Sequence, residues 1–332
     1  MLSAPEADVV SLTDFHVAPG ANGRSKVIGM SVRRLRLQAN RTYALVSASG
    51  RGKSVFLSLL SGFAPSSWRG QMTWTDWKMF GETIPHLQKP RRTPFPLFPV
   101  PRRNALIYLP QSFPQDRAEG LTTLEAMAFV LCASDRSRSL REAKRQVEEL
   151  VSEPRFNLHP SMLHQPIHQL SGGERRRVEL LTRLEAICPR GENSRIGDSR
   201  QALILLDEPT TGLDILNESE FIHFLSDLHR IAAARGIGLA ILVATHAFTH
   251  LSAQLSYFDE VLVLDRDEPG HPRNPPSMIR LVFQGALPDV FRHFAQFTEP
   301  DQAEHGWREI IQILEITSSD LLECAFYGGR QP

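Results

Sequence analysis

The stretch Gly50-Arg51-Gly52-Lys53-Ser54 decides the fold of this chain of 332 residues. Its glycines permit a tight turn in which backbone N–H groups close around phosphate oxygens. Lys53 adds a cation for terminal phosphates, and Ser54 offers a hydroxyl to Mg²⁺ at a helix N-terminus. The stretch therefore predicts a nucleotide-phosphate site between a strand over residues 42–47 and a helix that begins near Gly52.

Two later segments complete the sequence pattern of a nucleotide-driven motor protein. In Ser171-Gly172-Gly173-Glu174, a serine followed three residues later by a glutamate predicts a capped helix N-terminus whose amides can receive an anion. The apolar run Ala202–Leu206 ends in Asp207 and Glu208. Such a run is typical of a buried strand that delivers two carboxylates to a nucleotide site. Together the three segments predict an ATP-driven motor.

The three segments resemble the nucleotide-binding domain of ATP-binding-cassette (ABC) proteins, and the resemblance covers roughly residues 8–287. Further matches follow in the family's order: Gln111 in Tyr108-Leu109-Pro110-Gln111, Leu170 to Glu174, Pro209 to Thr211, Asp214, and His246 after Thr245. Several motifs in one order are far more specific than a phosphate loop alone. The resemblance implies an α/β fold, with a P-loop core on a mostly parallel sheet, an antiparallel β-subdomain and an inserted helical subdomain.

The resemblance also assigns ATP and Mg²⁺ as cofactors and distributes the site residues between two copies of the domain. It implies an ATP contact set in one copy: Ser47, Ser49, Gly50, Arg51, Gly52, Lys53 and Ser54. It places Ser171, Gly172 and Gly173 at the ATP of a second copy, and it adds Asp214 to the ATP-binding residues. The chain should therefore pair, either as a homodimer or with a related subunit.

The catalytic roles follow from the same resemblance. Glu208 is implied as the general base or orienter of the attacking water, and His246 as a contact of the γ-phosphate. The resemblance also implies that Gln111 senses Mg²⁺ and the attacking water. Mg²⁺ is implied to be organised by Ser54, Asp207 and Gln111.

Two departures from the family pattern leave a poorly hydrolysing regulatory module open. Ser47 stands where the family has its first glycine, so it would be strained if that position needs a positive φ, and Arg51 replaces a small residue. The family also stacks an aromatic residue on adenine after its first strand. Here only Phe15 and His16 stand near that place.

Composition restricts the classes of partner. Lys and Arg together number 37, as do Asp and Glu, so the formal net charge is zero. The chain therefore has no overall positive electrostatic potential that would favour binding to nucleic acid. The start, residues 1–6, lacks the features of a signal peptide, and the apolar stretch Ile237–Ala244 is too short to span a bilayer. Cys132, Cys188 and Cys324 are too widely spaced for a zinc or redox motif. We expect a cytoplasmic protein held at the cytoplasmic face of a membrane through a partner.

Helix caps, a proline-rich segment and an apolar pattern predict how the chain is organised. Capping boxes at Thr122 and Ser139 open helices of a helical subdomain over about residues 120–190. Residues 85–103 form an insertion rich in proline and basic residues, either a solvated loop or a contact with a partner or anionic surface. Residues 288–332, where apolar residues recur at helical spacing, predict a short helical extension.

The predicted function is the ATPase subunit of a transporter whose membrane-spanning permease is a separate chain. The stretch Gly285–Phe294 and the glutamate at position 174 look most like the G-subfamily of ABC exporters. Two alternatives stay open: a soluble ABC mechanoenzyme acting on nucleic acid or ribosomes, and the regulatory module. No nucleic-acid partner is expected from the charge balance.

Overall fold

The computed structural model describes a set of segments that together carry the fold. These are residues 7–18, 29–47, 50–63, 68, 72–85, 105–111, 120–135, 138–153, 156, 158–187, 200–211, 213, 215–245, 257–266, 278–286 and 289–290. Most of the insertion at 85–103 and nearly all of the extension at 288–332 lie outside them, so those predictions stay predictions.

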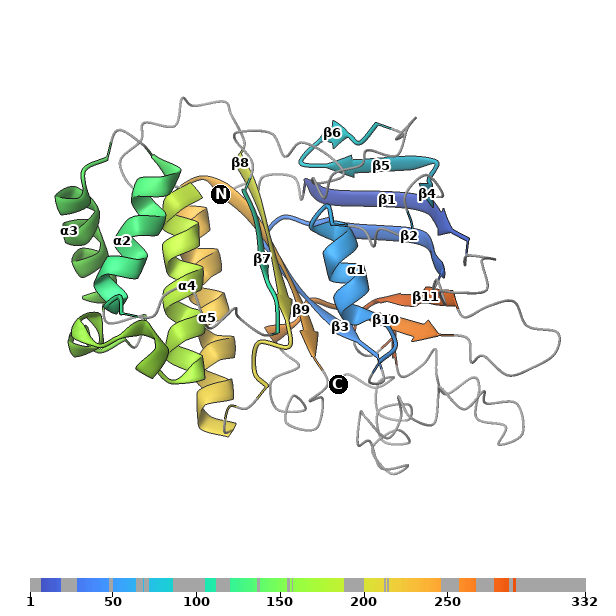
Figure 1. The fold of residues 1–332 in the computed structure, drawn as a ribbon. Helices are drawn as coiled ribbons and strands as arrows, with labels where there is room; N and C mark the ends of the chain where they lie inside the picture. The colour runs from blue at the N-terminus through green and yellow to red at the C-terminus, as the bar shows by residue number, and fades with distance from the viewer. Residues whose placement is uncertain are drawn as a thin grey trace, which may run out of the picture.

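One mixed sheet runs through the described residues (Figure 1). Its strands are β1 Asp8–Val17, β2 Gly29–Gln38, β3 Arg41–Val46, β4 Met72–Thr73, β5 Asp76–Met79, β6 Glu82–Thr83, β7 Ala105–Leu109, β8 Arg200–Asp207, β9 Ile237–Thr245, β10 Glu260–Arg266 and β11 Met278–Gly285. The order is β6-β5-β1-β2-β11-β10-β3-β9-β8-β7, with β4 beside β1. Neighbours from β10 through β3, β9 and β8 to β7 are parallel, whereas β1 pairs antiparallel with β2, β4 and β5.

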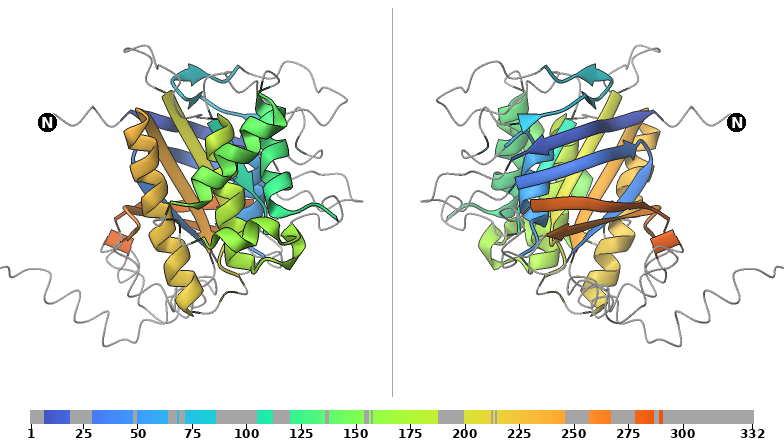
Figure 2. Two further views of the ribbon diagram at one scale, coloured as in Figure 1. Left: turned by 90° about the vertical axis from the view of Figure 1, so that its left-hand side faces the viewer. Right: turned by 90° about the vertical axis from the view of Figure 1, so that its right-hand side faces the viewer.

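Helices cover the parallel part of the sheet on both faces. They are α1 Lys53–Leu60, α2 Thr123–Ser134, α3 Leu140–Val151, α4 Gly172–Ile187 and α5 Ile215–Ala234, with short 3-10 turns η4 Pro160–His164 and η5 Ile167–Gln169. Figure 1 shows the helices α2 to α4 at one end of the molecule and the antiparallel strands at the other, and the two views of Figure 2 look onto these ends in turn. The predicted P-loop α/β fold with a helical insertion and an antiparallel region is confirmed.

Alternation along the strands explains the two layers. In β8, Ala202, Ile204 and Leu206 join the core beneath α4 and α5, whereas Leu203 and Leu205 join the core that includes α1. Successive side chains of a strand point to opposite faces, so a strand covered on both sides is apolar throughout. This continuous apolar run brings Asp207 to the carboxyl edge of the sheet without breaking either core.

The antiparallel end has its own aromatic cluster. Phe15 is 1% exposed, its ring centroid lies 6.4 Å from that of Trp74 and 5.8 Å from that of Trp77, and the two tryptophans meet edge to face. Such pairs stabilise a core beyond the area they bury. Phe15 is therefore part of the core, and it does not serve as the adenine platform considered from the sequence.

The helical region begins at the predicted caps. Thr122 Oγ1 accepts from the Glu125 amide while the Glu125 carboxylate accepts from the Thr122 amide, and Ser139 and Glu142 repeat the arrangement. Each pair satisfies backbone donors that a helix start leaves free, so both capping boxes are confirmed. No helix among the described residues is long and apolar enough to cross a membrane.

Candidate active site

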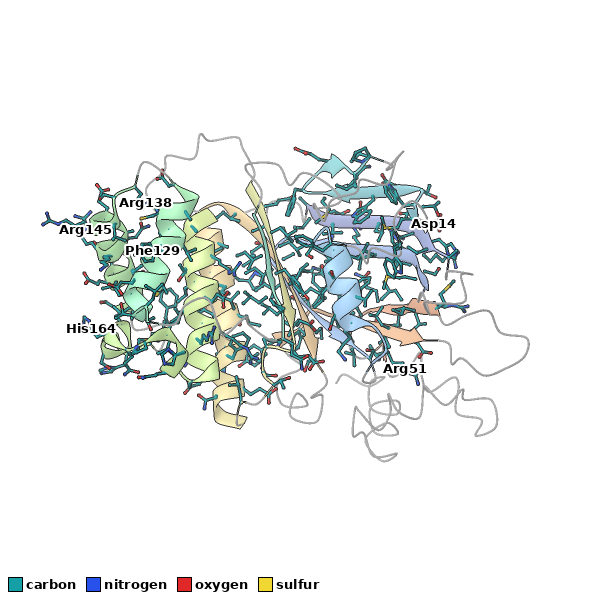
Figure 3. All side chains as sticks on the ribbon, in the orientation of Figure 1. Asp14, Arg51, Phe129, Arg138, Arg145 and His164 are labelled. Carbon is teal, nitrogen blue, oxygen red and sulfur yellow. The ribbon has the colours of Figure 1, made fainter. Side chains whose placement is uncertain are left out.

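The phosphate loop joins β3 to α1 and needs glycine at two places. Gly50 has φ 73° and Gly52 has φ 102°, both in the left-handed region. A Cβ on Gly52 would also lie 2.2 Å from Cδ1 of Ile279 on β11, so a larger residue there would require the Ile279 side chain to move. Arg51 lies between them, beside the start of α1 (Figure 3).

Ser47 is not strained in the way considered from the sequence. It is fully buried at the end of β3, and it is absent from the described non-glycine residues with positive φ, which are Asp14, Asn40, Phe80 and Glu208. A serine can adopt its backbone conformation without the cost that a left-handed residue carries. The strain argument for a weakly hydrolysing module is therefore wrong at this position.

Lys53 is the cation at the centre of the site. Its Nζ donates to the Ser47 carbonyl oxygen at 3.2 Å and lies 3.8 Å from Glu208 Oε1, and the side chain is 4% exposed. Burial lowers the pKa of Lys53 to about 8, and the nearby charges of Glu208 and Asp207 oppose that shift. The lysine is thus held extended at the site by a carbonyl and a carboxylate.

Asp207 carries the chemistry expected of a magnesium ligand. Burial raises the pKa of its carboxyl group, while a hydrogen bond from the Ser54 side chain lowers it. The Tyr108 hydroxyl donates to Asp207 Oδ2 at 3.5 Å, but the buried Oδ1 has no hydrogen-bond partner among the described residues. A buried carboxylate oxygen without a donor, beside a serine hydroxyl, fits a hard cation with oxygen ligands.

Glu208 is held from several sides. Gln111 Nε2 donates to its Oε2 at 2.7 Å, and Thr211 Oγ1 donates to the same oxygen at 3.4 Å. Its backbone has φ 51°, and its amide donates to the Ala244 carbonyl at 2.9 Å. A left-handed non-glycine residue costs about 1–3 kcal/mol, and such residues gather at functional sites. Lys53, Gln111 and Glu208, selected from distant parts of the sequence, do meet in one site.

The signature segment, Leu170–Glu174, leads into helix α4. Ser171 and Glu174 form the predicted capping box, with the Ser171 amide 3.0 Å from Glu174 Oε2 and the Glu174 amide 3.3 Å from Ser171 Oγ. Gly172 is exposed, and Gly173 is buried near Leu213. The capped helix start is thus confirmed, while its role as an anion receptor stays a prediction.

Three predicted site residues, Ser49, Asp214 and His246, lie outside the described residues, so their roles remain predictions. Tyr108 and Thr211 are contacts that the sequence argument missed. Both were quoted within motifs, but a tyrosine in a strand and a threonine after a proline carry no functional signal on their own. Burial and the charge of Asp207 raise the pKa of Tyr108 to about 12, so Tyr108 is a neutral donor to that carboxylate.

Comparison with known proteins identifies relatives of the whole arrangement. A family model described as ABC transporter matches residues 31–186. A hemin import ATP-binding protein of Idiomarina loihiensis is 28% identical over 272 residues, covering 81% of this chain and 88% of the relative. A lipoprotein-releasing system ATP-binding protein of the same organism is 31% identical over 212 residues, covering 63% of this chain and 76% of the relative. Neither is named as a G-subfamily exporter, so the expected resemblance to that subfamily is wrong.

Solved structures show the same fold. CbiO1 of Clostridium perfringens, part of the ABC transporter complex CbiONQ, superposes with a TM-score of 0.58 at 17% identity, covering 94% of this chain and all of that chain. A dimeric bacterial ABC transporter cassette superposes with a TM-score of 0.51 at 18% identity, covering 76% of this chain and 93% of that chain. At such identities the comparison establishes the fold alone.

Proposed function

The chain belongs to the ABC transporter family, and on that premise we propose that it hydrolyses ATP to drive a separate membrane-spanning partner. The observation that supports this most is the meeting of Lys53, Gln111, Asp207 and Glu208 at one edge of the sheet. Lys53 begins α1, directly after the loop that follows β3, Gln111 lies after β7, and Asp207 and Glu208 lie at the end of β8. Ligands of open α/β sheets bind at the carboxyl ends of parallel strands.

The residues divide the work between binding and reaction. Backbone amides of residues 50–54 and the Lys53 ammonium bind the β- and γ-phosphates. Ser54 and Asp207 would hold Mg²⁺, which neutralises charge on the phosphate oxygens when bound. Glu208 accepts or orients the proton of the attacking water, and Gln111 keeps the Glu208 carboxylate turned toward the site.

Two copies of the site are needed for turnover. Ser171 and the glycines after it form the capped start of α4, where free amides would bind an anion. We place this receptor, with Asp214, over the γ-phosphate of a second cassette, so that ATP binds the two copies together. The same arrangement assigns His246 to the γ-phosphate of its own site.

The partner and direction of transport follow from the relatives. One relative is named for hemin import and others for vitamin B12 import. A structural neighbour is part of a multi-component transporter complex. These names favour an import system in which the chain sits at the cytoplasmic face of the membrane through its permease. The cassette spans residues 8–287, its helical subdomain about residues 120–190.

Purification of the tagged full-length protein from membranes of its own cells tests the proposal. We expect a polytopic membrane protein to co-purify and ATP turnover to rise in its presence. Recovery with ribosomes or nucleic acid, together with turnover stimulated by RNA or DNA, would contradict the transporter assignment. Turnover absent with the partner present would instead favour the regulatory module.

A further inference from the structure

Arg176 joins α4, the signature helix that begins at Gly172, to the turn that follows Glu208. It lies one helical turn into α4 and is 9% exposed. Its Nη1 donates to the carbonyl oxygen of Pro209 and lies 3.5 Å from that of Thr211. Both acceptors are backbone groups of the turn that begins at the proposed catalytic carboxylate.

The environment of Arg176 is unusual for a buried cation. Burial lowers the pKa of its guanidinium, and none of the ion pairs found in the described part of the chain includes it. A buried charge is costly unless hydrogen bonds compensate it. The next residue, Arg177, does have a carboxylate, with Nη1 3.0 Å from Glu220 Oε2. Compensation of Arg176 in this region therefore comes from the two carbonyl groups.

The turn that Arg176 holds fixes an unfavourable backbone at Glu208. Glu208 has φ 51°, which a glutamate seldom adopts. The Thr211 amide donates to the Glu208 carbonyl at 3.2 Å, and the Leu213 amide to the Thr210 carbonyl at 3.0 Å. Strained residues persist only where the surroundings over-determine them. Arg176 supplies a restraint from outside the turn.

A second contact joins the same two segments. A Cβ on Gly172 would meet Leu213 Cδ2 at 3.6 Å, and one on Gly173 would meet it at 3.7 Å, both ordinary packing distances. Leu213 therefore packs over the start of α4, while Arg176 bonds to the turn from within that helix. The proposed receptor for a second ATP and the turn at Glu208 form one packed unit.

We propose that Arg176 is a positioning residue that holds the Glu208 turn in its left-handed conformation, so that the carboxylate stays against Gln111 and Lys53. The inference rests on the proposed ATPase function. Because Arg176 belongs to the signature helix, it also connects the half-site for the partner's ATP with the half-site for the chain's own ATP. Movement of α4 when a second cassette binds would thus be transmitted to Glu208 through these bonds.

Substitution of Arg176 in the full-length protein, measured with its partner, tests this role. In Arg176→Gln we expect kcat to fall at least about tenfold while the Kd for a non-hydrolysable ATP analogue changes less than about twofold, since Arg176 does not touch the nucleotide. Arg176→Lys keeps a donor for one carbonyl and should recover most of the lost kcat. Arg183→Gln is the matched control: its partner is Glu179 on the same helix, at 2.7 Å, and it does not reach the turn. Its kcat should be unchanged.

A double-mutant cycle separates positioning from general destabilisation. If Arg176 acts through Glu208, then Arg176→Gln should change the residual turnover of Glu208→Gln by less than about twofold. The proposal would be overturned if the turnover of the double variant fell by the product of the two single-variant losses. An unchanged kcat in Arg176→Gln would also overturn it. A lower melting temperature with a normal kcat for the folded fraction would also overturn it. Absence of turnover in the unsubstituted protein would refute the proposed function instead, without bearing on Arg176.

Discussion

Lys53 illustrates how single residues balance charge in this site. Its side chain is almost fully buried, yet it lies near two carboxylates and a carbonyl group. Burial disfavours the charged lysine and the neighbouring anions favour it. The outcome is a cation whose protonation is sensitive to pH near the range in which proteins are assayed.

The Lys53 shift predicts a pH dependence of both stability and binding. Below pH 8 the lysine is charged in the folded and unfolded states, and from about 8 to 10.5 the folded protein loses the proton first. In that window the stability contributed by this group rises with pH, because the unfolded state binds more protons. ATP affinity should fall over the same window, since phosphate binding requires the cation.

Calorimetry in buffers of different ionisation enthalpy measures this effect. At about pH 9, ATP binding should take up close to one proton more in the unsubstituted protein than in Lys53→Arg, because arginine stays protonated. Equal proton uptake by the two proteins would show that the Lys53 pKa is not lowered.

Ser47→Gly tests the conformation of the phosphate loop. Because Ser47 lacks a positive φ, glycine relieves no strain there and adds freedom to the unfolded chain. We expect the free energy of unfolding to fall by about 0.5–1 kcal/mol, with no gain in ATP affinity. Urea denaturation and equilibrium binding measure the two quantities. Tighter binding in the glycine variant would restore the strain argument.

At the scale of elements, the site depends on how α1 meets the sheet. Gly52 precedes α1 and lies against Ile279 of β11, a strand that pairs with β2 and β10. The phosphate loop is thereby fixed to strands that come much later in the chain. Helix α1 has only 8 residues, and so short a helix is not stable by its own propensity. The position of the phosphate loop therefore depends on its packing against β11.

Gly52→Ala and Gly50→Ala separate two reasons for glycine in this loop, which are the left-handed backbone conformation and the lack of space for a side chain. A Cβ at Gly50 meets nothing within 4 Å, so its alanine variant should lose only about 1–2 kcal/mol from its left-handed φ. Gly52→Ala meets the same penalty and also the Ile279 side chain, so it should be the less stable variant and bind ATP more weakly. Equal stability of the two variants would show that the contact with β11 is easily relieved. Thermal unfolding under identical conditions gives the comparison.

At the scale of the whole molecule, the two halves of the chemistry lie in different parts of one chain. Lys53 and Glu208 meet at the sheet edge, while the capped segment at Ser171, the proposed receptor for a second ATP, begins α4. Helix α4 packs against α2 and α5, and the described part of α2 exposes Phe129 at its surface (Figure 3). A second cassette completes both half-sites in the proposed function.

Glu208→Gln should trap that assembly. The amide cannot accept the water's proton, so turnover should fall by at least about a hundredfold while ATP still binds. We expect an ATP-dependent dimer in sedimentation velocity. Adding Ser171→Glu to this variant places a negative charge at the receptor and should abolish the dimer without weakening ATP binding to the monomer. A dimer that forms equally without ATP would contradict the role of nucleotide in pairing.

The sequence by itself determined the features that depend on neighbours along the chain. The phosphate loop, the capping boxes at Thr122, Ser139 and Ser171, and the apolar strand ending at Asp207 are set by short-range geometry and by alternation. These features carried the resemblance to ABC proteins, and that resemblance in turn implied the parallel core and grouped Lys53, Gln111 and Glu208 in one site.

Only the tertiary structure decided the features that depend on distant segments. The backbone of Ser47 is unstrained, Phe15 belongs to an aromatic core, Tyr108 contacts Asp207, and Arg176 reaches the carbonyl groups after Glu208. In each case the contact or conformation is fixed by packing between elements, and no spacing in the sequence encodes it. A residue's type states which bonds it can make, and the fold alone decides which partner is within reach.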